Sequence, residues 1–352
     1  MSAETSVVIL NWNGARLLPA CLSALAGQTY RDFDLYLVDN GSIDESGALL
    51  DDLQRERHPG WLSAPLPRTP IIIRNGTNAG FAAGNNQAFR ATHSKYVVAL
   101  NNDAFPEPEW LGELVAAAEA YNRIGMVAST MLFAHRPDRV ASAGIALFTD
   151  GVALDNAMGA RASTLARRGV RPVFGASAGA ALYRSEMLCD VGLFDERFFS
   201  YLEDADLAWR ARWRGWRAVH NPAARVLHEY SATGGHNSPF KTALISRNRV
   251  WLLFKNMPEA LLRRYLPQVL RYDLLAVAYA LSRGDRYLLK GRLDGLRALR
   301  SFVPERRKAL TSARLHPDEM ARLLAPALPP RTALRYRRRL DALLRRSTET
   351  EA

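Results

Sequence analysis

Short apolar runs alternate with helical stretches along the first hundred residues. The stretches at 17–25 and 45–55 carry leucines at helical spacing. Four runs predict strands, at 5–10 (TSVVIL), 34–38 (DLYLV), 71–73 (III) and 96–100 (YVVAL). Strands that alternate with helices at this spacing predict βαβ units, and hence an α/β fold around a mostly parallel sheet.

Polar residues follow three of these predicted strands. They are Asn11 and Asn13 after the first, Asp39, Asn40 and Ser42 after the second, and Asn101, Asn102 and Asp103 after the fourth. In open α/β sheets ligands bind beyond the carboxyl ends of the strands. We therefore expect these side chains to converge on one crevice.

The pattern is less regular in the second half of the chain. The stretch 141–173 is rich in Gly and Ala and receives no assignment, whereas the small residues at 175–183 predict a segment where backbone closely approaches a ligand. A helix is predicted from Leu207 onward. After Pro239 the sequence is helical and basic to its end, with predicted interruptions at prolines 258, 267, 304, 317, 326, 329 and 330. A boundary near 240 divides the chain into 1–240 and 241–352.

Composition narrows the class of protein. The chain has 352 residues, of which 48% are apolar, enough for one large core or two ordinary ones. Its longest apolar run in the C-terminal part, 274–281, has eight residues, against the roughly 18 that a membrane-spanning helix needs. Cys21 and Cys189 form no CxxC pair, which argues against a disulfide framework or a zinc ribbon. Because Glu4 occupies the expected basic region of a signal peptide, we expect a cytoplasmic protein.

The net charge of +12 is unevenly distributed. Residues 241–352 hold 25 Lys or Arg and 10 Asp or Glu, a net charge of +15, so the remainder carries −3. Such an arm is typical of proteins that meet a polyanion, either nucleic acid or an anionic lipid surface. Leucines alternate with Arg263, Arg264 and Arg271 at helical spacing, which favours peripheral attachment at the inner face of the cell membrane. A helical subdomain that forms a homo-oligomer is the alternative.

Several residues could carry chemistry, each beside a simpler structural interpretation. Asp39 could accept hydrogen bonds from a ribose or a pyrimidine, but Asp-Asn-Gly-Ser is also strong turn chemistry. The loop 78–86 (NAGFAAGNN) allows close backbone approach and lacks the lysine of a P-loop, while Asn85 and Asn86 could cap a helix. Asp103 could hold Mg²⁺ together with substrate phosphates, or cap a turn before Pro106.

A dense acidic cluster lies further along, at Glu203, Asp204 and Asp206. Carboxylates favour the first turn of a helix, yet three of them beside aromatic residues exceed what a helix start requires. Crowded carboxylates near apolar rings gain proton affinity, which suits a general base. His228 could ligate a metal or bind a diphosphate, although a lone histidine is more often a packed core residue.

The order of these motifs is more informative than any one of them. The segments VVILNWNG, LVDNGSID, NAGFAAGNN, ALNNDA, GASAGAALYRSEM, GLFDERFFSYLEDADLAWRARWRGW and VLHEYSATGG follow one another. Together they resemble the inverting family 2 glycosyltransferases of the GT-A fold, in particular their rhamnosyltransferase-like branch. The resemblance covers roughly residues 5–255, including the RNR at 247–249.

The resemblance implies a role for each matching position. Asp204 would be the general base with Glu203 beside it, and Asp103 with His228 would bind Mg²⁺ or Mn²⁺ together with the diphosphate. The first acidic position of the DxD motif is Asn101 here, which leaves a single carboxylate. The nucleotide-sugar would be bound by Asn11, Asn13, Asp39, Asn40, Ser42, Asn78, Gly80, Phe81, Asn85, Asn86 and Asn102.

The resemblance favours transfer of L-rhamnose from dTDP-rhamnose to a saccharide or polyprenyl-diphosphate-linked acceptor in cell-surface polysaccharide synthesis. A UDP-hexose donor and a non-catalytic sugar-nucleotide-binding scaffold are the alternatives. A sugar-nucleotide pyrophosphorylase would need a Gly- and Arg-rich start with a lysine, which residues 9–25 lack. No nucleic-acid partner is expected, because the chain carries no RNP-like or helix-turn-helix signature.

Overall fold

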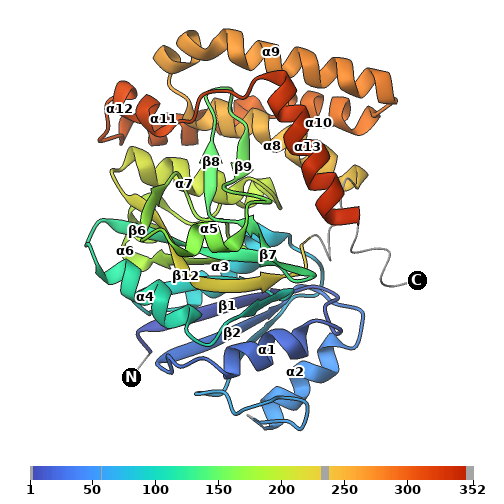
Figure 1. The fold of residues 1–352 in the computed structure, drawn as a ribbon, viewed down its shortest axis with the longest axis vertical. Coiled ribbons are helices and arrows are strands. Elements are labelled where there is room, and N and C mark those ends of the chain that lie inside the picture. The colour runs from blue at the N-terminus through green and yellow to red at the C-terminus, as the bar shows by residue number, and fades with distance from the viewer. Residues whose placement is uncertain (1–2, 57, 231–237, 346–352) are drawn as a thin grey trace.

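The computed structural model describes residues 3–56, 58–230 and 238–345 (Figure 1). Within them the chain forms a central sheet, a two-stranded hairpin and helices on both faces of the sheet. The strands are β1 (Thr5–Asn11), β2 (Phe33–Asp39), β3 (Ile71–Arg74), β4 (Tyr96–Asn101), β5 (Ala104–Pro106), β6 (Ile124–Phe133), β7 (Arg136–Ser142), β8 (Ile145–Leu147), β9 (Ala153–Asp155), β10 (Arg171–Val173), β11 (Ala180–Arg184) and β12 (Arg217–His228).

Helices follow most of these strands. Those of the first two thirds are α1 (Leu18–Ala26), α2 (Ser46–Arg55), α3 (Phe81–Ala91), α4 (Trp110–Glu119), α5 (Ala162–Ala166), α6 (Ser185–Val191) and α7 (Glu203–Trp213). Those of the last third are α8 (Pro239–Asn256), α9 (Glu259–Arg283), α10 (Arg286–Arg297), α11 (Val303–Thr311), α12 (Pro317–Leu323) and α13 (Pro330–Arg345).

The central sheet runs in the order β10-β12-β6-β11-β4-β1-β2-β3. β1 pairs in parallel with β2 and β4, β2 with β3, and β6 with β12, while β11 is antiparallel to both of its neighbours. The prediction of a mostly parallel sheet is confirmed. The register places Asn11 opposite Asp39, and Leu10 opposite Asn101, so the polar residues after three strands meet at one edge.

Alternate residues of β1 face two different cores. Val7 and Ile9 pack on the side covered by α1 and α4, whereas Val8 faces the side of α3, α7 and α8. All three side chains are fully buried. A strand covered on both faces reads as a continuous apolar run, which is the TSVVIL pattern.

The unassigned stretch 141–173 contains the end of β7, the β8–β9 hairpin, α5 and β10. Each of β8, β9 and β10 has three residues. A strand of that length is too short for an alternating pattern to identify it, which explains why the sequence alone did not place it.

The last third packs against the rest of the chain through α8 (Figure 1). Trp251 of α8 belongs to the same core as Val8. α10 packs so closely on α8 that only glycine fits at position 291. An added Cβ there would be 2.3 Å from the carbonyl oxygen of Ala243. No described helix is long and apolar enough to cross a membrane.

Two helix predictions need correction. Pro267 does not interrupt the chain but lies inside α9. Pro267 has no N–H to donate to the carbonyl of Arg263, but both residues are exposed, so water can serve that carbonyl. α7 begins at Glu203 rather than at Leu207, so the acidic cluster occupies its first turn.

Candidate active site

Side-chain amides bind one another at the ends of β1 and β4. The amide nitrogen of Asn102 donates to Asn11 Oδ1 at 2.8 Å, and Asn11 Nδ2 donates to Ser42 Oγ at 3.3 Å. The Ser42 hydroxyl also accepts from the backbone N–H of Asn13 at 2.9 Å. An added Cβ at Gly14 would be 2.1 Å from Asn102 Nδ2. Glycine is therefore required where the loop passes this network.

A second cluster forms around Asn40. Its Nδ2 donates to Asn78 Oδ1 at 2.9 Å and to the carbonyl of Gly80 at 3.3 Å, and its Oδ1 accepts from the N–H of Ala79. Asp39, which is buried, accepts from the N–H of Ser42 at 3.3 Å. The structure thus brings together the residues predicted after β2 and in the loop before α3.

Asn85 and Asn86 do not cap a helix, because α3 begins at Phe81 and both residues lie inside it. Asn85 Nδ2 donates to the carbonyl of Phe81, and Asn86 Nδ2 donates to the carbonyl of Phe194 at 2.9 Å. The amide nitrogens of both side chains are thus bonded to protein carbonyls, and Asn86 fastens α3 to the segment at Phe194.

Asp103 and His228 meet where β12 pairs with β5. The Oδ1 atom of Asp103 lies 3.0 Å from His228 Nε2, and both side chains are buried. Burial opposes ionisation of Asp103, but the imidazole outweighs it and lowers the carboxyl pKa; burial likewise opposes protonation of His228, whose pKa the carboxylate raises. Asn101 Nδ2 lies 3.4 Å from the same imidazole nitrogen.

This pair fits a divalent cation. Asp103 Oδ1 has no hydrogen-bond partner among the described residues apart from its ion pair, and His228 Nδ1 has none either. The described residues hold no group of three or more His, Cys, Asp or Glu that could bind a metal alone. One carboxylate with substrate phosphates and water is a common way to hold Mg²⁺, so a bound diphosphate would have to complete the coordination.

The acidic pair lies at the first turn of α7. Burial raises the pKa of Asp204 to about 6, although the N–H groups of Ala178 and Ala205 donate to its carboxylate at 3.2 and 2.8 Å. Burial, followed by the charge of Asp204, raises the pKa of Glu203 well above its usual value. The pKa of both carboxyl groups is therefore raised, and the value of about 6 for Asp204 lies within reach of neutral pH.

A chain of contacts links the acidic pair to Asp103. Ala178, which donates to Asp204, precedes Gly179, whose carbonyl accepts from the N–H of Asn101 at 2.9 Å. The Asn101 amide reaches His228, which pairs with Asp103. Although about a hundred positions separate Asp103 from Asp204 in the sequence, a short chain of contacts joins them in the fold.

Further residues, which the sequence analysis did not propose for the site, lie next to His228 and Asp204. The ring of Tyr230 lies edge-on to His228, with 5.8 Å between centroids, and Lys241 Nζ lies 5.2 Å from the ring of Tyr201 and 5.7 Å from that of Tyr230. Burial raises the pKa of Asp155, a residue of β9 close enough to influence Asp204 and His228 electrostatically. No motif marked Asp155, because it belongs to the unassigned stretch.

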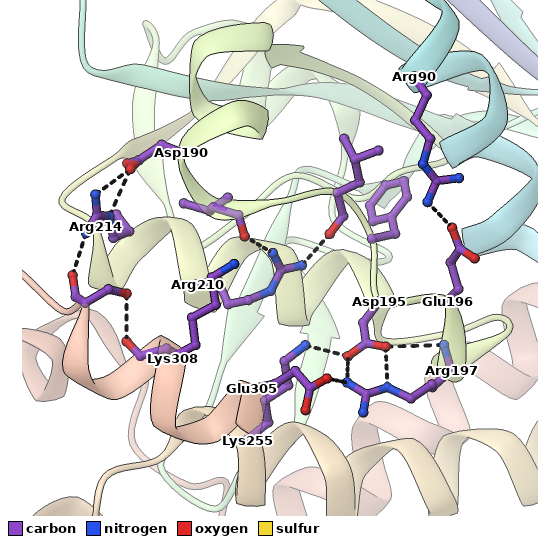
Figure 2. A pocket seen from close by; sticks show the side chains of 15 residues that line it. Arg90, Asp190, Asp195, Glu196, Arg197, Arg210, Arg214, Lys255, Glu305 and Lys308 are labelled. Atoms are coloured by element: carbon purple, nitrogen blue, oxygen red, sulfur yellow. Dashed lines mark hydrogen bonds and ion pairs between the residues drawn. The ribbon is translucent and has the colours of Figure 1, made fainter. Parts of the chain in front are cut away.

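Asp206, the third acidic residue, has a structural role. It is fully buried and pairs with Arg210 of the same helix at 2.8 Å and with Lys255 of α8 at 2.9 Å, and the second pair fastens α7 to α8. Lys255 also pairs with Asp195 beside a hollow of about 410 Å³ between α7 and α11 (Figure 2). Ion pairs among the lining residues occupy this hollow, and no residue predicted for the active site lines it.

Comparison with known proteins agrees with this geometry. The sequence pattern described as Glycosyl transferase family 2 matches residues 6–189, more than half of the chain. The chain therefore belongs to glycosyl transferase family 2.

Individual relatives match over parts of their length. The chain is 42% identical over 67 residues to the N-acetylglucosaminyl-diphospho-decaprenol L-rhamnosyltransferase of Mycobacterium tuberculosis (19% of this chain, 22% of the relative). It is 54% identical over 112 residues to a PGL/p-HBAD biosynthesis glycosyltransferase of Mycobacterium bovis (32% and 40%). It is 26% identical over 243 residues to the O-antigen biosynthesis protein RfbC of Myxococcus xanthus (65% and 18%). The chain thus spans less than half the length of these relatives.

Solved structures share the fold. GalNAc-T7 with UDP, GalNAc and Mn²⁺ superposes with a TM-score of 0.60 at 14% identity, covering 86% of this chain and 57% of that one. The mannosyltransferase PcManGT of Pyrobaculum calidifontis, in complex with GDP-Man and Mn²⁺, gives 0.53 at 17% identity and covers 89% and 86%. The predicted GT-A fold is confirmed.

Proposed function

We propose that the protein is an inverting, metal-dependent glycosyltransferase that moves a sugar from a nucleoside diphosphate to an acceptor hydroxyl. One observation carries the proposal: a short chain of contacts joins the acidic pair to the Asp103–His228 pair, next to the amide network at the ends of β1 and β4. Membership of glycosyl transferase family 2 supports it. We assign residues 1–240 to donor binding and catalysis and 241–352 to a helical, arginine-rich region.

Asp204 is the general base in this proposal. It takes the proton of the acceptor hydroxyl as that oxygen attacks the anomeric carbon from the face opposite the diphosphate, so the configuration inverts in one displacement. A base works best when its pKa lies near the operating pH, and a pKa of about 6 meets that condition. Glu203, whose pKa burial and the charge of Asp204 raise, lies beside the base at the start of α7.

The donor lies along the strand ends. The Asn11, Asp39 and Asn40 clusters bind the nucleoside, and the loop from Asn78 to Phe81 packs against the nucleotide-sugar. Asp103 and His228 would hold Mg²⁺ or Mn²⁺ against the diphosphate. When bound, the ion supplies positive charge that offsets the charge developing on the leaving group.

We assign the donor as dTDP-L-rhamnose and the acceptor as a saccharide or a polyprenyl-diphosphate-linked saccharide. The name of the mycobacterial rhamnosyltransferase relative supports this choice, as does that of the O-antigen biosynthesis relative for polysaccharide synthesis. A UDP-hexose donor is the alternative, favoured by the GalNAc-T7 structure, which is a complex with UDP.

Thermal-shift measurements with dTDP and UDP, each with and without Mn²⁺, test the proposal. A ligand that binds only the folded protein raises its melting temperature. We expect a shift with dTDP plus Mn²⁺ that is larger than with UDP, followed by rhamnosyl transfer from dTDP-rhamnose. A preference for UDP would reassign the donor. Binding without transfer to any acceptor would instead favour a sugar-nucleotide-binding scaffold.

We further propose that α9 contacts an anionic membrane surface and brings the enzyme to a lipid-linked acceptor. α9 lies along the outer edge of the molecule, at the end opposite α1 and α2 (Figure 1). Leu270, Leu274 and Leu281 are 51, 70 and 65% exposed at helical spacing. Arg271 and Arg283 are exposed on the same helix, and basic residues near an anionic surface contribute about 1 kcal/mol each.

Vesicle binding tests this surface. We expect the protein to sediment with phosphatidylglycerol vesicles, to bind neutral vesicles less, and to be released by salt. The double variant Leu270→Gln, Leu274→Gln should lose binding, whereas Val170→Gln, which changes an exposed apolar residue elsewhere, should retain it. If the wild-type protein does not bind vesicles but forms a dimer that the double variant loses, α9 is an oligomer contact instead.

A further inference from the structure

The loop before the acidic pair has an unusual backbone conformation. Phe199, Tyr201 and Leu202 have φ angles of 64°, 70° and 68°, in a region that residues other than glycine rarely adopt. Glu203 and Asp204 follow directly. Backbone strain of this kind persists only where the surrounding structure enforces it, and it clusters at functional sites. Specific contacts must therefore hold this loop.

Asn248 of α8 makes such contacts. Its side chain is fully buried, and Nδ2 lies 2.9 Å from the carbonyl oxygen of Phe198, 2.9 Å from that of Ser200 and 2.7 Å from that of Tyr201. One amide group thus gathers three carbonyls from four consecutive residues. An extended segment cannot aim those carbonyls at one point, so the amide selects the left-handed conformation.

Arg247 fixes the direction of that amide. Its Nε donates to Asn248 Oδ1 at 2.9 Å, and a terminal nitrogen donates to the carbonyl of Phe198 at 2.9 Å. The guanidinium lies 4.2 Å from the centroid of the Trp251 ring. With Oδ1 bonded to Arg247, Nδ2 must face the loop. A carboxylate at position 248 would keep the bond to Arg247 but would face the three carbonyl oxygens with lone pairs.

The same loop contacts the start of α3, next to the residues proposed to bind the nucleotide-sugar. The carbonyl of Phe199 accepts from the N–H of Ala82 at 3.0 Å, at the start of α3. An added Cβ at Gly80 would be 2.5 Å from the ring of Phe199. At its other end, the carbonyl of Leu202 accepts from the N–H of Asp206 inside α7. The loop therefore connects the nucleotide-sugar loop to the helix that carries Asp204.

We propose that Asn248 is a positioning residue that holds the loop 198–202 and thereby sets where the Asp204 carboxylate meets the acceptor hydroxyl. The inference rests on the proposed role of Asp204 as the base. Asn248 acts through the loop and touches no reacting group. Displacement of a catalytic group by about 1 Å can cost about 100-fold in rate. Loss of the Asn248 contacts should therefore affect turnover more than binding.

The variant Asn248→Asp tests this inference, because it preserves size and removes the donor. We expect kcat to fall about 100-fold while the Kd for the nucleoside diphosphate stays near the wild-type value. The matched control is Asn221→Asp, which removes a buried amide that donates to the carbonyl of Glu113 outside the site. It should lower the melting temperature and leave kcat of the folded enzyme unchanged.

Hydrogen exchange gives a readout that does not need activity. The N–H groups of Ala82 and Asp206, which donate to carbonyls of the loop, should exchange faster in Asn248→Asp and normally in Asn221→Asp. If Asn248→Asp does not fold, Arg247→Gln should show the same changes more weakly, because that side chain is only half-buried.

The proposed role of Asn248 would be overturned by a wild-type kcat in folded Asn248→Asp, or by unchanged hydrogen exchange at the N–H groups of Ala82 and Asp206. A kcat loss matched by an equal loss of nucleotide affinity would also overturn it, since the loop would then serve binding alone. A wild-type enzyme that transfers no sugar would refute the proposed function, whereas the exchange measurement would still decide whether Asn248 holds the loop.

Discussion

The two sides of the proposed active site differ in their chemistry. On the strand-end side, neutral amides bind one another in pairs, Asn102 with Asn11 and Asn40 with Asn78. On the α7 side, burial raises the pKa values of Glu203 and Asp204, and the preceding loop has left-handed backbone angles. In the proposed mechanism, the side assigned to binding is held by hydrogen bonds, whereas the side assigned to the reaction carries unfavourable charge and backbone strain, which cluster at functional sites.

The largest effect should come from the reacting side. Asp204→Asn removes the proposed base and should lower kcat about 10²- to 10⁴-fold, the usual contribution of general base catalysis. The Kd for the nucleoside diphosphate, measured by calorimetry, should stay near the wild-type value. Turnover at the wild-type rate in this variant would show that Asp204 is not the base. The proposed difference in role between the α7 side and the strand-end side would then fail.

The binding side can be tested by crowding its amides. Gly14→Ala places a Cβ 2.1 Å from Asn102 Nδ2 and 2.3 Å from Asn11 Oδ1, so the 2.8 Å bond between them must break. Buried amides without partners cost about 1–3 kcal/mol, so nucleotide affinity should fall about tenfold or more. Gly76→Ala, where no atom lies within 4 Å of the added Cβ, is the matched control. Equal affinities in the two variants would contradict the amide network's role.

The pH dependence of turnover should report the acidic pair. Because the proposed base must be ionised and its pKa is about 6, kcat should fall about tenfold per pH unit below pH 6. Turnover measured between pH 5 and 8 with saturating donor gives this limb. A fall in kcat only near pH 4 would contradict the raised pKa of Asp204.

A smaller effect concerns stability. The pKa of Asp204 rises from 3.8 to about 6 on folding, so the folded state binds the proton more tightly, and its stability falls as the pH rises from about 4 to 6 and stays lower above that. Asp204→Asn should therefore melt at a higher temperature than the wild type at pH 8, with the difference vanishing near pH 4. Calorimetric scans at both pH values measure it. A variant that melts lower at pH 8 would show that Asp204 stabilises the fold.

Much of the framework could be predicted because long, regular patterns carry it. The runs TSVVIL, DLYLV and YVVAL became β1, β2 and β4 with ends displaced by one residue. The polar residues after them met at one sheet edge because parallel strands end on the same side. The β8–β9 hairpin and Asp155 were not predicted, because three-residue strands have no detectable period.

The sequence by itself determined the family, the alternation of strands and helices, and the identity of the acidic pair, since these depend on local order and residue type. Only the tertiary structure decided which partners each acidic residue has. Asp206 forms ion pairs with Lys255 and Arg210, whereas Asp204, two positions earlier, accepts from the backbone N–H groups of Ala178 and Ala205. The hydrogen bonds from Asn248 to the loop 198–202, about fifty positions away, also depend on packing. Long-range contacts of this kind set the burial and partners of each group, and no local pattern encodes them.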